Sequence, residues 1–178
     1  MTSHLASSLH AMCLLLLALC LATGSSPGFA RVERLDDSTS PRSQVTSPPM
    51  LSEQGQPLDR YIPGPAPTVG VVKFGRVEYR LATARFAGKQ ARIYYVIPVA
   101  IAGLRSPAGL RVEWRGHGLF ADGIARPGQR TLVWSGTVRD ATMSEGLDLT
   151  MRIELRELQL RPGAGLAFES FFEIEVSP

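Results

Sequence analysis

The chain has 178 residues, of which 44% are hydrophobic, and its formal net charge is +3. This length allows one domain of ordinary size with short additional segments, but not two well-packed cores. The balance of 19 Lys and Arg residues against 16 Asp and Glu residues is too even to indicate a nucleic-acid-binding protein.

Residues 1–30 have the pattern of a secretory signal peptide. They contain no Asp, Glu, Lys or Arg, and residues 11–22 form a continuous apolar run. This run is too short to span a bilayer as a helix, which requires about 20 residues, but it fits the hydrophobic region of an export signal. We favour cleavage after Ala30 over cleavage after Gly24. The sequence therefore predicts an exported protein, either periplasmic or extracellular.

Two alternatives exist for this segment. It lacks the basic residues that usually begin a signal peptide, so an uncleaved membrane anchor is the first. The second is lipid attachment at Cys20, which is disfavoured because Leu19 stands where such a signal needs a small residue. Cys13 and Cys20 are the only cysteines, so the cleaved chain would have no disulfide, thiol nucleophile or cysteine metal site. That composition suits a bacterial envelope protein better than a small eukaryotic secreted module.

Residues 31–67 are rich in Pro, Ser, Thr and Gln, and their apolar residues are sparse and aperiodic. Such a segment buries too little apolar surface to offset the entropy lost on ordering. We predict a disordered linker. The alternative is a tail that becomes ordered on a partner, for example by adding a strand to another subunit. Donated strands normally carry alternating apolar residues, which this segment lacks.

From residue 68 to 178, short runs of alternating apolar and polar residues are separated by Gly, Pro and Asp. Successive side chains of a strand point to opposite faces, so each run predicts a strand with one buried face. The predicted strands are residues 69–74, 77–86, 92–101, 110–115, 129–139, 147–160 and 166–176. Pro98 places the third at a sheet edge or at a bulge.

Two of these strands carry more detailed expectations. In residues 129–139 we expect Leu132, Trp134 and Val138 to share one face. In residues 147–160 the clean alternation from Leu147 to Leu155 predicts a core strand. The later apolar residues are out of phase with it, which predicts a β-bulge near Arg156 and Glu157.

Seven or eight strands with a turn signal every dozen residues predict an antiparallel β-sandwich of the immunoglobulin-like or jelly-roll type. A barrel is the second choice. The predicted organisation is a signal peptide over 1–30, a linker over 31–67 and the sandwich over 68–178.

Few residues of the predicted domain could carry chemistry. His117 is the only histidine after residue 30, and no motif supplies a nucleophile or an orienting acid for it. No cluster of His, Cys or carboxylates predicts a metal site, and no glycine motif predicts a phosphate site. We therefore predict a protein that is not an enzyme and that needs no cofactor or metal.

Two features mark a possible interaction surface. The first is the glycine-rich loop 116–128, which contains His117. Trp114, Phe120 and Trp134 flank this loop and could form a ligand or glycan platform, although Trp on an apolar face more often belongs to the core. The second is charge segregation: residues 73–139 hold 12 basic and 3 acidic residues, whereas residues 140–178 hold 3 basic and 8 acidic. Glu169, Glu173 and Glu175 represent the acidic part. Ion pairing between strands of one sheet is the simpler explanation of this charge segregation. The alternative is head-to-tail association between copies of the chain through complementary charged faces.

These features predict an exported, non-enzymatic protein for adhesion, assembly or another protein interaction at a bacterial cell envelope. Its partner would be another protein or a second copy of the chain, with no nucleic acid and no membrane span after signal cleavage. The alternative is a periplasmic ligand-binding or inhibitor module that uses the loop 116–128.

Overall fold

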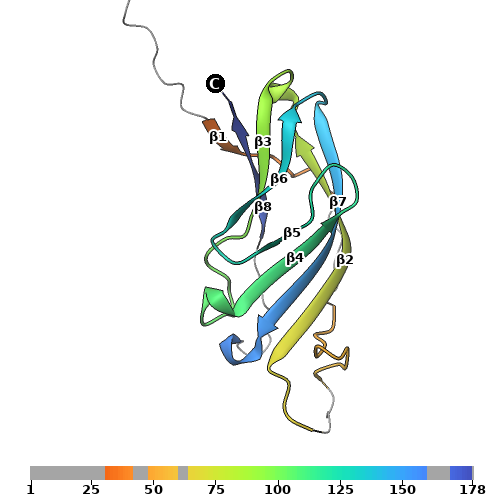
Figure 1. Ribbon diagram of the computed structural model, residues 1–178, viewed down its shortest axis with the longest axis vertical. Coiled ribbons are helices and arrows are strands. Elements are labelled where there is room, and N and C mark those ends of the chain that lie inside the picture. The colour runs from red at the N-terminus through yellow and green to blue at the C-terminus, as the bar shows by residue number, and fades with distance from the viewer. Residues whose placement is uncertain (1–30, 42–47, 60–63, 160–168, 178) are drawn as a thin grey trace, which may run out of the picture.

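The computed structural model describes residues 31–41, 48–59, 64–159 and 169–177, in which eight β-strands and three short 3-10 turns are formed (Figure 1). The predicted signal peptide lies outside these residues. The strands are β1 (Arg31–Arg34), β2 (Val69–Ala82), β3 (Gln90–Val96), β4 (Leu110–Gly116), β5 (Gly123–Ala125), β6 (Arg130–Thr137), β7 (Thr142–Glu154) and β8 (Phe171–Val176). The turns are η1 (Ala84–Phe86), η2 (Pro107–Gly109) and η3 (Leu155–Glu157). No helix in these parts of the chain is long and apolar enough to cross a membrane.

The strands form two antiparallel sheets, with the orders β1-β8-β3-β6 (sheet A) and β2-β7-β4-β5 (sheet B). The first strand therefore pairs with the last, β2 with β7, β3 with β6, and β4 with β5. This nested pairing is that of an eight-stranded jelly roll. The predicted antiparallel sandwich is confirmed, and the two sheets do not join into a barrel.

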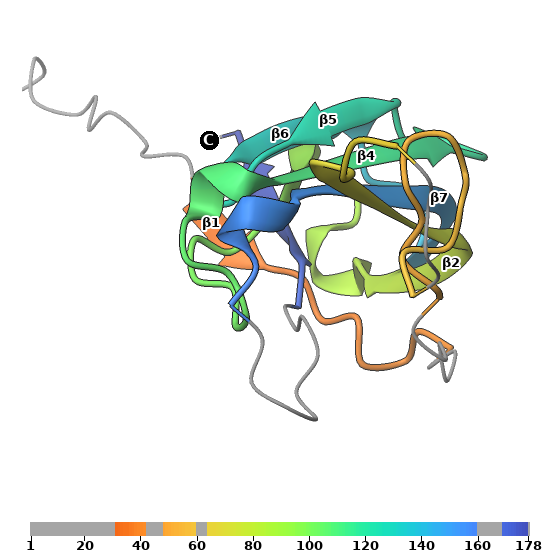
Figure 2. The same ribbon diagram turned by 90° about the horizontal axis from the view of Figure 1, so that it is seen from below.

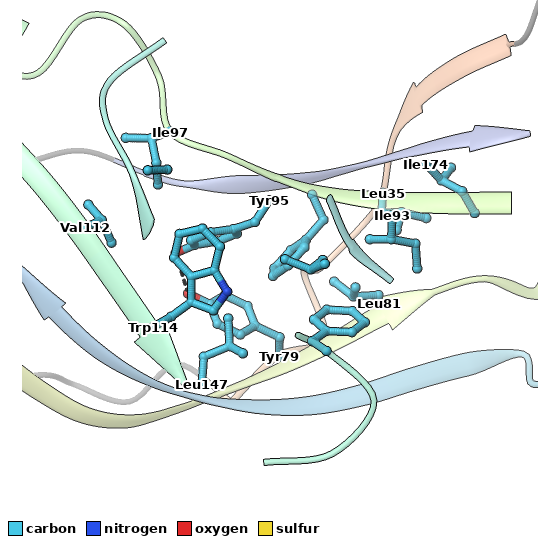
Figure 3. Packing of buried hydrophobic residues seen from close by; sticks show 14 of the residues in the cluster. Leu35, Tyr79, Leu81, Ile93, Tyr95, Ile97, Val112, Trp114, Leu147 and Ile174 are labelled. Atoms are coloured by element: carbon cyan, nitrogen blue, oxygen red, sulfur yellow. Dashed lines mark hydrogen bonds between the residues drawn. The ribbon is translucent and has the colours of Figure 1, made fainter. Parts of the chain in front are cut away.

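The core lies between the sheets and is built from the apolar positions of the alternating strands. On β7, Leu147, Met151 and Ile153 are buried and Leu149 is partly buried. β4 and β8 contribute in the same alternating way through Leu110, Val112, Trp114, Phe172 and Ile174. Figure 3 shows Tyr79 of β2, Tyr95 of β3 and Trp114 of β4 gathered between the sheets. The predicted core face of residues 147–155 is confirmed for the four positions within β7.

The inward face predicted for residues 129–139 is wrong at Leu132. Its side chain is 47% exposed, whereas Val133 beside it is buried. The register between β3 and β6 shifts between Ile93 and Tyr94, which leaves Val133 as an extra residue. This β-bulge changes which residues point inward, and sequence alternation alone does not reveal where it lies.

Other strand boundaries also differ from the prediction. Residues 69–74 and 77–86 join into one strand, β2, with an irregularity between Lys73 and Gly75. β7 begins at Thr142, before the predicted start at residue 147, and ends at Glu154. The bulge predicted near Arg156 and Glu157 is replaced by the 3-10 turn η3. β5, which lies in the predicted loop 116–128, was not expected.

The described parts of residues 31–67 differ from the expected disordered linker, because they pack on the sandwich. β1 pairs with β8, and Leu35, which follows it, is buried in the core. Further along, Leu51 forms a bridge with Val71 at the edge of β2. A few apolar anchors suffice here because they complete the edges of sheets that the rest of the chain already forms. Figure 2 shows the first segment, in orange, leading away from β1, and the second, in gold, beside β2.

Candidate functional site

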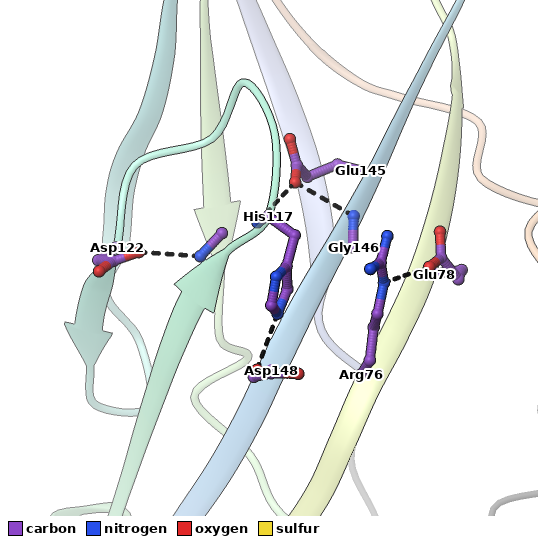
Figure 4. Close-up of polar contacts among 8 residues, drawn as sticks. Arg76, Glu78, His117, Asp122, Glu145, Gly146 and Asp148 are labelled. Atoms are coloured by element: carbon purple, nitrogen blue, oxygen red, sulfur yellow. Dashed lines mark hydrogen bonds and ion pairs between the residues drawn. The ribbon is translucent and has the colours of Figure 1, made fainter.

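One buried carboxylate fixes the loop between β4 and β5 to sheet B. Glu145 of β7 is 3% exposed. Its Oε1 accepts the backbone N–H groups of His117 and Gly146, both at 3.1 Å (Figure 4). Its Oε2 accepts those of Leu119 at 2.6 Å and Phe120 at 3.0 Å. A carboxylate has about four acceptor positions, so these four N–H groups satisfy it and stabilise its charge.

The Gly116-His117-Gly118 sequence is needed for this close approach. A Cβ on Gly116 would lie 2.0 Å from the carbonyl oxygen of Phe120, and one on Gly118 would lie 2.9 Å from Oε2 of Glu145. Any larger residue at either position would push the loop away from the carboxylate. The two glycines therefore serve the geometry of the loop.

Two of the three aromatic residues predicted to flank this loop belong to the core, and the third, Trp134, is partly buried against it. Trp114 and Phe120 are buried, and their rings lie 5.0 Å from Tyr95 and 5.6 Å from Phe172, respectively. The indole Nε1 of Trp114 donates to the carbonyl oxygen of Ala121 at 3.0 Å, which ties the loop to β4. The rings therefore support the loop from below and do not form an exposed platform.

His117 lies at the start of the loop, with its side chain partly exposed. Its Nε2 is 2.8 Å from Oδ2 of Asp148, on the outer face of β7. Its backbone N–H is shared between Glu145 and the carbonyl oxygen of Gly146. In the described residues, no Ser, Thr or Cys is hydrogen-bonded to this histidine. The arrangement thus orders the loop and provides no paired nucleophile.

The three predicted acidic residues make ion pairs within sheet A. Glu173 and Glu175 of β8 both bind Arg130 of β6, at 2.7 and 3.0 Å, and Arg92 of β3 lies 3.4 Å from Glu175. Glu169 lies 3.4 Å from Arg34 of β1.

The guanidinium of Arg130 also lies over the ring of Tyr94, 3.4 Å from its centroid. Burial opposes its charge, but the hydrogen bonds that Arg130 donates to Glu175 and Glu173 outweigh this and raise the pKa of Arg130. These glutamates are therefore paired with arginines from other strands of sheet A and do not form a free acidic surface.

The surface around the loop offers two features that could contact a partner. Leu119 and Ile124 have exposed side chains, at 61% and 58%. The outer face of sheet B beside them carries an open hollow of about 500 Å³. Its lining residues are Glu113, Trp114, Arg115, Asp122, Gly123, Ile124, Asp148 and Thr150.

Sequence reasoning missed Glu145, Leu119, Ile124 and Asp148. One signal for Glu145 was available, because it lies two residues before Leu147 and continues the same inward face of the strand. A charged residue on an inward face requires partners. The predicted strand began only at residue 147, so it did not include Glu145, which lies within β7.

No cluster of three or more His, Cys, Asp or Glu residues in the described parts of the chain is placed to hold a metal ion. Comparison with known proteins adds no assignment: no family model matches the chain, and no curated protein or solved structure is significantly similar to it.

Proposed function

We propose that the chain is an exported, non-enzymatic jelly-roll domain that binds a protein at a bacterial cell envelope. The observation that carries the proposal is the loop 117–120, which the buried Glu145 holds rigidly while Leu119 stays 61% exposed. The export part rests on the signal-like residues 1–30.

A rigid loop with an exposed apolar side chain is suited to binding a protein. Ordering a mobile loop costs free energy on association, and a loop that is already fixed avoids that cost. Apolar anchors near the centre of an interface supply much of its binding energy. Leu119 has this character, and Ile124 adds a second exposed apolar group from β5.

The polar groups of the loop have structural roles, which favours binding over catalysis. The oxygens of Glu145 are occupied by four backbone N–H groups, and His117 contacts Asp148. A general base must reach the proton of a reacting group, and Glu145 faces the inside of the loop.

Site-specific photo-crosslinking in the producing cell tests the binding proposal. A photoreactive amino acid is placed at Leu119 of the full-length chain and, as a matched control, at Val99, which is 64% exposed in a different loop. We expect a discrete adduct from position 119, none from position 99, and loss of the adduct when Glu145→Gln is added. Equal labelling at both positions, or no adduct at 119, would contradict the proposal.

The export part has its own test. Cell fractionation and N-terminal sequencing of the purified protein should find it outside the cytoplasm with Arg31 as its first residue. An intact N-terminus on a cytoplasmic protein would refute export.

The hollow beside the loop favours a second candidate function, a periplasmic ligand-binding module. Its lining has three carboxylates, from Glu113, Asp122 and Asp148, against one guanidinium, from Arg115. With the hydroxyl of Thr150, this excess of acceptors suits a cationic or hydroxyl-rich small molecule. Thermal-shift measurements with polyamines and oligosaccharides would support this function if a shift disappears in Asp122→Asn and Asp148→Asn. No shift with either class would exclude it.

A further inference from the structure

Residues 31–41, here called the N-terminal arm, join the edges of the two sheets. β1 lies at the edge of sheet A against β8. The next N–H, of Leu35, donates to the carbonyl oxygen of Phe172 at 2.9 Å. The arm then crosses to sheet B, where the carbonyl oxygen of Asp36 accepts the N–H of Ala82 at 2.9 Å. Figure 2 shows this path, in orange, from β1 towards β2.

The arm is held by one strand pairing and one buried side chain. Leu35 is the only arm residue that is buried, at 1% exposure. The ion pairs that connect the arm to the domain, Glu33 with Arg85 at 2.8 Å and Arg34 with Glu169 at 3.4 Å, involve arginine side chains that are more than half exposed. Exposed ion pairs contribute little to stability. Detachment of the arm would break only the pairing of β1 with β8, the contacts of Leu35 and the hydrogen bonds to the edge of β2.

Removal of the arm would leave a site that only the same sequence fills well. β8 would have an unpaired edge, the core would have a cavity of the size of Leu35, and the N–H groups of Arg80 and Ala82 would lose Ser40 and Asp36 as acceptors. The arm of a second copy would make all these contacts in the same way. An arm bound within its own chain and an arm bound by a second copy make the same contacts, and the two states differ in the effective concentration of the arm at the site.

The charges of the arm favour this partner over the addition of a foreign strand. In the register of β1 and β8, Arg34 lies opposite Glu173 and Val32 opposite Glu175. β1 is the edge strand of sheet A and carries three charged residues, Arg31, Glu33 and Arg34, and charged side chains on an edge strand discourage pairing with a further strand. Charge complementarity is found in the pairing of β1 with β8, where Arg34 lies opposite Glu173.

We propose that the N-terminal arm is exchanged between two copies of the chain, with β1 of each copy pairing with β8 of the other. The proposal extends the proposed function, since it names a second copy as one partner in assembly. Reciprocal exchange uses the same surface on both copies and leaves no unfilled site, so it produces a closed dimer.

Cysteine pairs at register positions test the exchange. The full-length chain carries Cys13→Ser and Cys20→Ser so that only the introduced thiols react. One preparation has Val32→Cys and a second, of different mass, has Glu175→Cys. The two are mixed at high concentration, incubated near the melting temperature, and treated with a short bis-maleimide. We expect a mixed crosslinked dimer at least fivefold more abundant than in a control mixture in which Leu132→Cys, on β6, replaces Glu175→Cys.

A single chain that carries both Val32→Cys and Glu175→Cys gives an independent readout. Crosslinking it as a dilute monomer before concentration should hold the arm in its own chain and abolish the dimer in size-exclusion chromatography. The pair Arg34→Cys and Glu173→Cys repeats the test if the first pair does not fold. The proposed exchange would be overturned if the mixed crosslinked dimer is no more abundant than in the Leu132→Cys control mixture. It would also be overturned if the dimer persists after the crosslink within one chain has formed. Photo-crosslinking at Leu119 probes a different surface of the domain. The proposed function and the proposed exchange can therefore fail independently of each other.

Discussion

The Oε2 atom of Glu145 lies 2.6 Å from the backbone nitrogen of Leu119, which is 26 residues earlier in the chain. This contact and three others like it make a single side chain responsible for the conformation of a whole loop. The glycine-rich loop 116–128 is therefore attached to sheet B by a residue of β7, one of the two inner strands of that sheet.

Glu145→Gln should destabilise the domain by roughly 2–4 kcal/mol, because one acceptor oxygen becomes an NH2 group that faces two backbone N–H donors. Urea denaturation of the variant and the wild type measures the difference. Glu78→Gln is the matched control, since Glu78 pairs with Arg76 at the surface and should cost no more than about 1 kcal/mol. Equal losses in the two variants would show that the Glu145 contacts do not fix the loop.

The core face of β7 predicts different costs for two similar substitutions. Ile153→Ala removes a fully buried side chain and should cost about 2–5 kcal/mol, because it leaves a cavity. Leu149→Ala should cost less, since Leu149 is only partly buried. Chemical denaturation of both variants checks this order. A loss below about 1 kcal/mol for Ile153→Ala would refute its assignment to the core.

Leu35→Ala tests whether the N-terminal arm contributes to stability. Because Leu35 is buried while Val32 beside it is 47% exposed, Leu35→Ala should cost roughly 2–4 kcal/mol and Val32→Ala less than about 0.5 kcal/mol. Thermal unfolding compares the two. If both variants melt together with the wild type, the arm does not pack on the sandwich in solution.

Two buried tyrosines predict a loss of stability in alkali. The hydroxyl of Tyr95 lies 2.7 Å from Ser170 and 3.4 Å from the hydroxyl of Tyr79. Burial raises the pKa of Tyr79 and raises the pKa of Tyr95 well above the ordinary value of 10.0. The folded state therefore keeps both protons when the unfolded state begins to lose them.

The stability that these protons provide is complete below pH 10 and is lost as the pH rises from there towards the raised values. Each tyrosine should contribute a slope of up to about 1.4 kcal/mol per pH unit. Denaturation at a series of pH values above 10 should show a shallower slope for Tyr95→Phe than for the wild type. Identical slopes would mean that Tyr95 ionises equally in both states.

Alternation of apolar and polar residues predicts correctly which side chains of a strand are buried when one face is apolar, the other is polar and no bulge interrupts the strand. In β4, Leu110, Val112 and Trp114 alternate with charged residues and are buried as expected. In β6 the same reasoning fails at Leu132, because a bulge at Val133 depends on the register with β3. Register is a property of two strands, so one strand's pattern does not contain it.

The candidate site was only partly visible in the sequence for a similar reason. The loop 116–128 was identified from its glycines, but its main support, Glu145, belongs to a strand that follows it. Composition also failed for the N-terminal arm, because a segment that is polar on average can still hold one leucine in a core. Which residue serves as the anchor depends on the cavity that other strands create.

The pairing of β1 with β8 places Arg31 opposite Val176, so the two ends of the described chain become neighbours. During synthesis β1 emerges first and β8 last of the eight described strands. Sheet A therefore cannot be completed until all eight have been made, and contacts so distant in sequence are expected to form slowly. Until then β1 has no partner strand, so the strand that begins the described chain takes its place only after the strand that ends it exists.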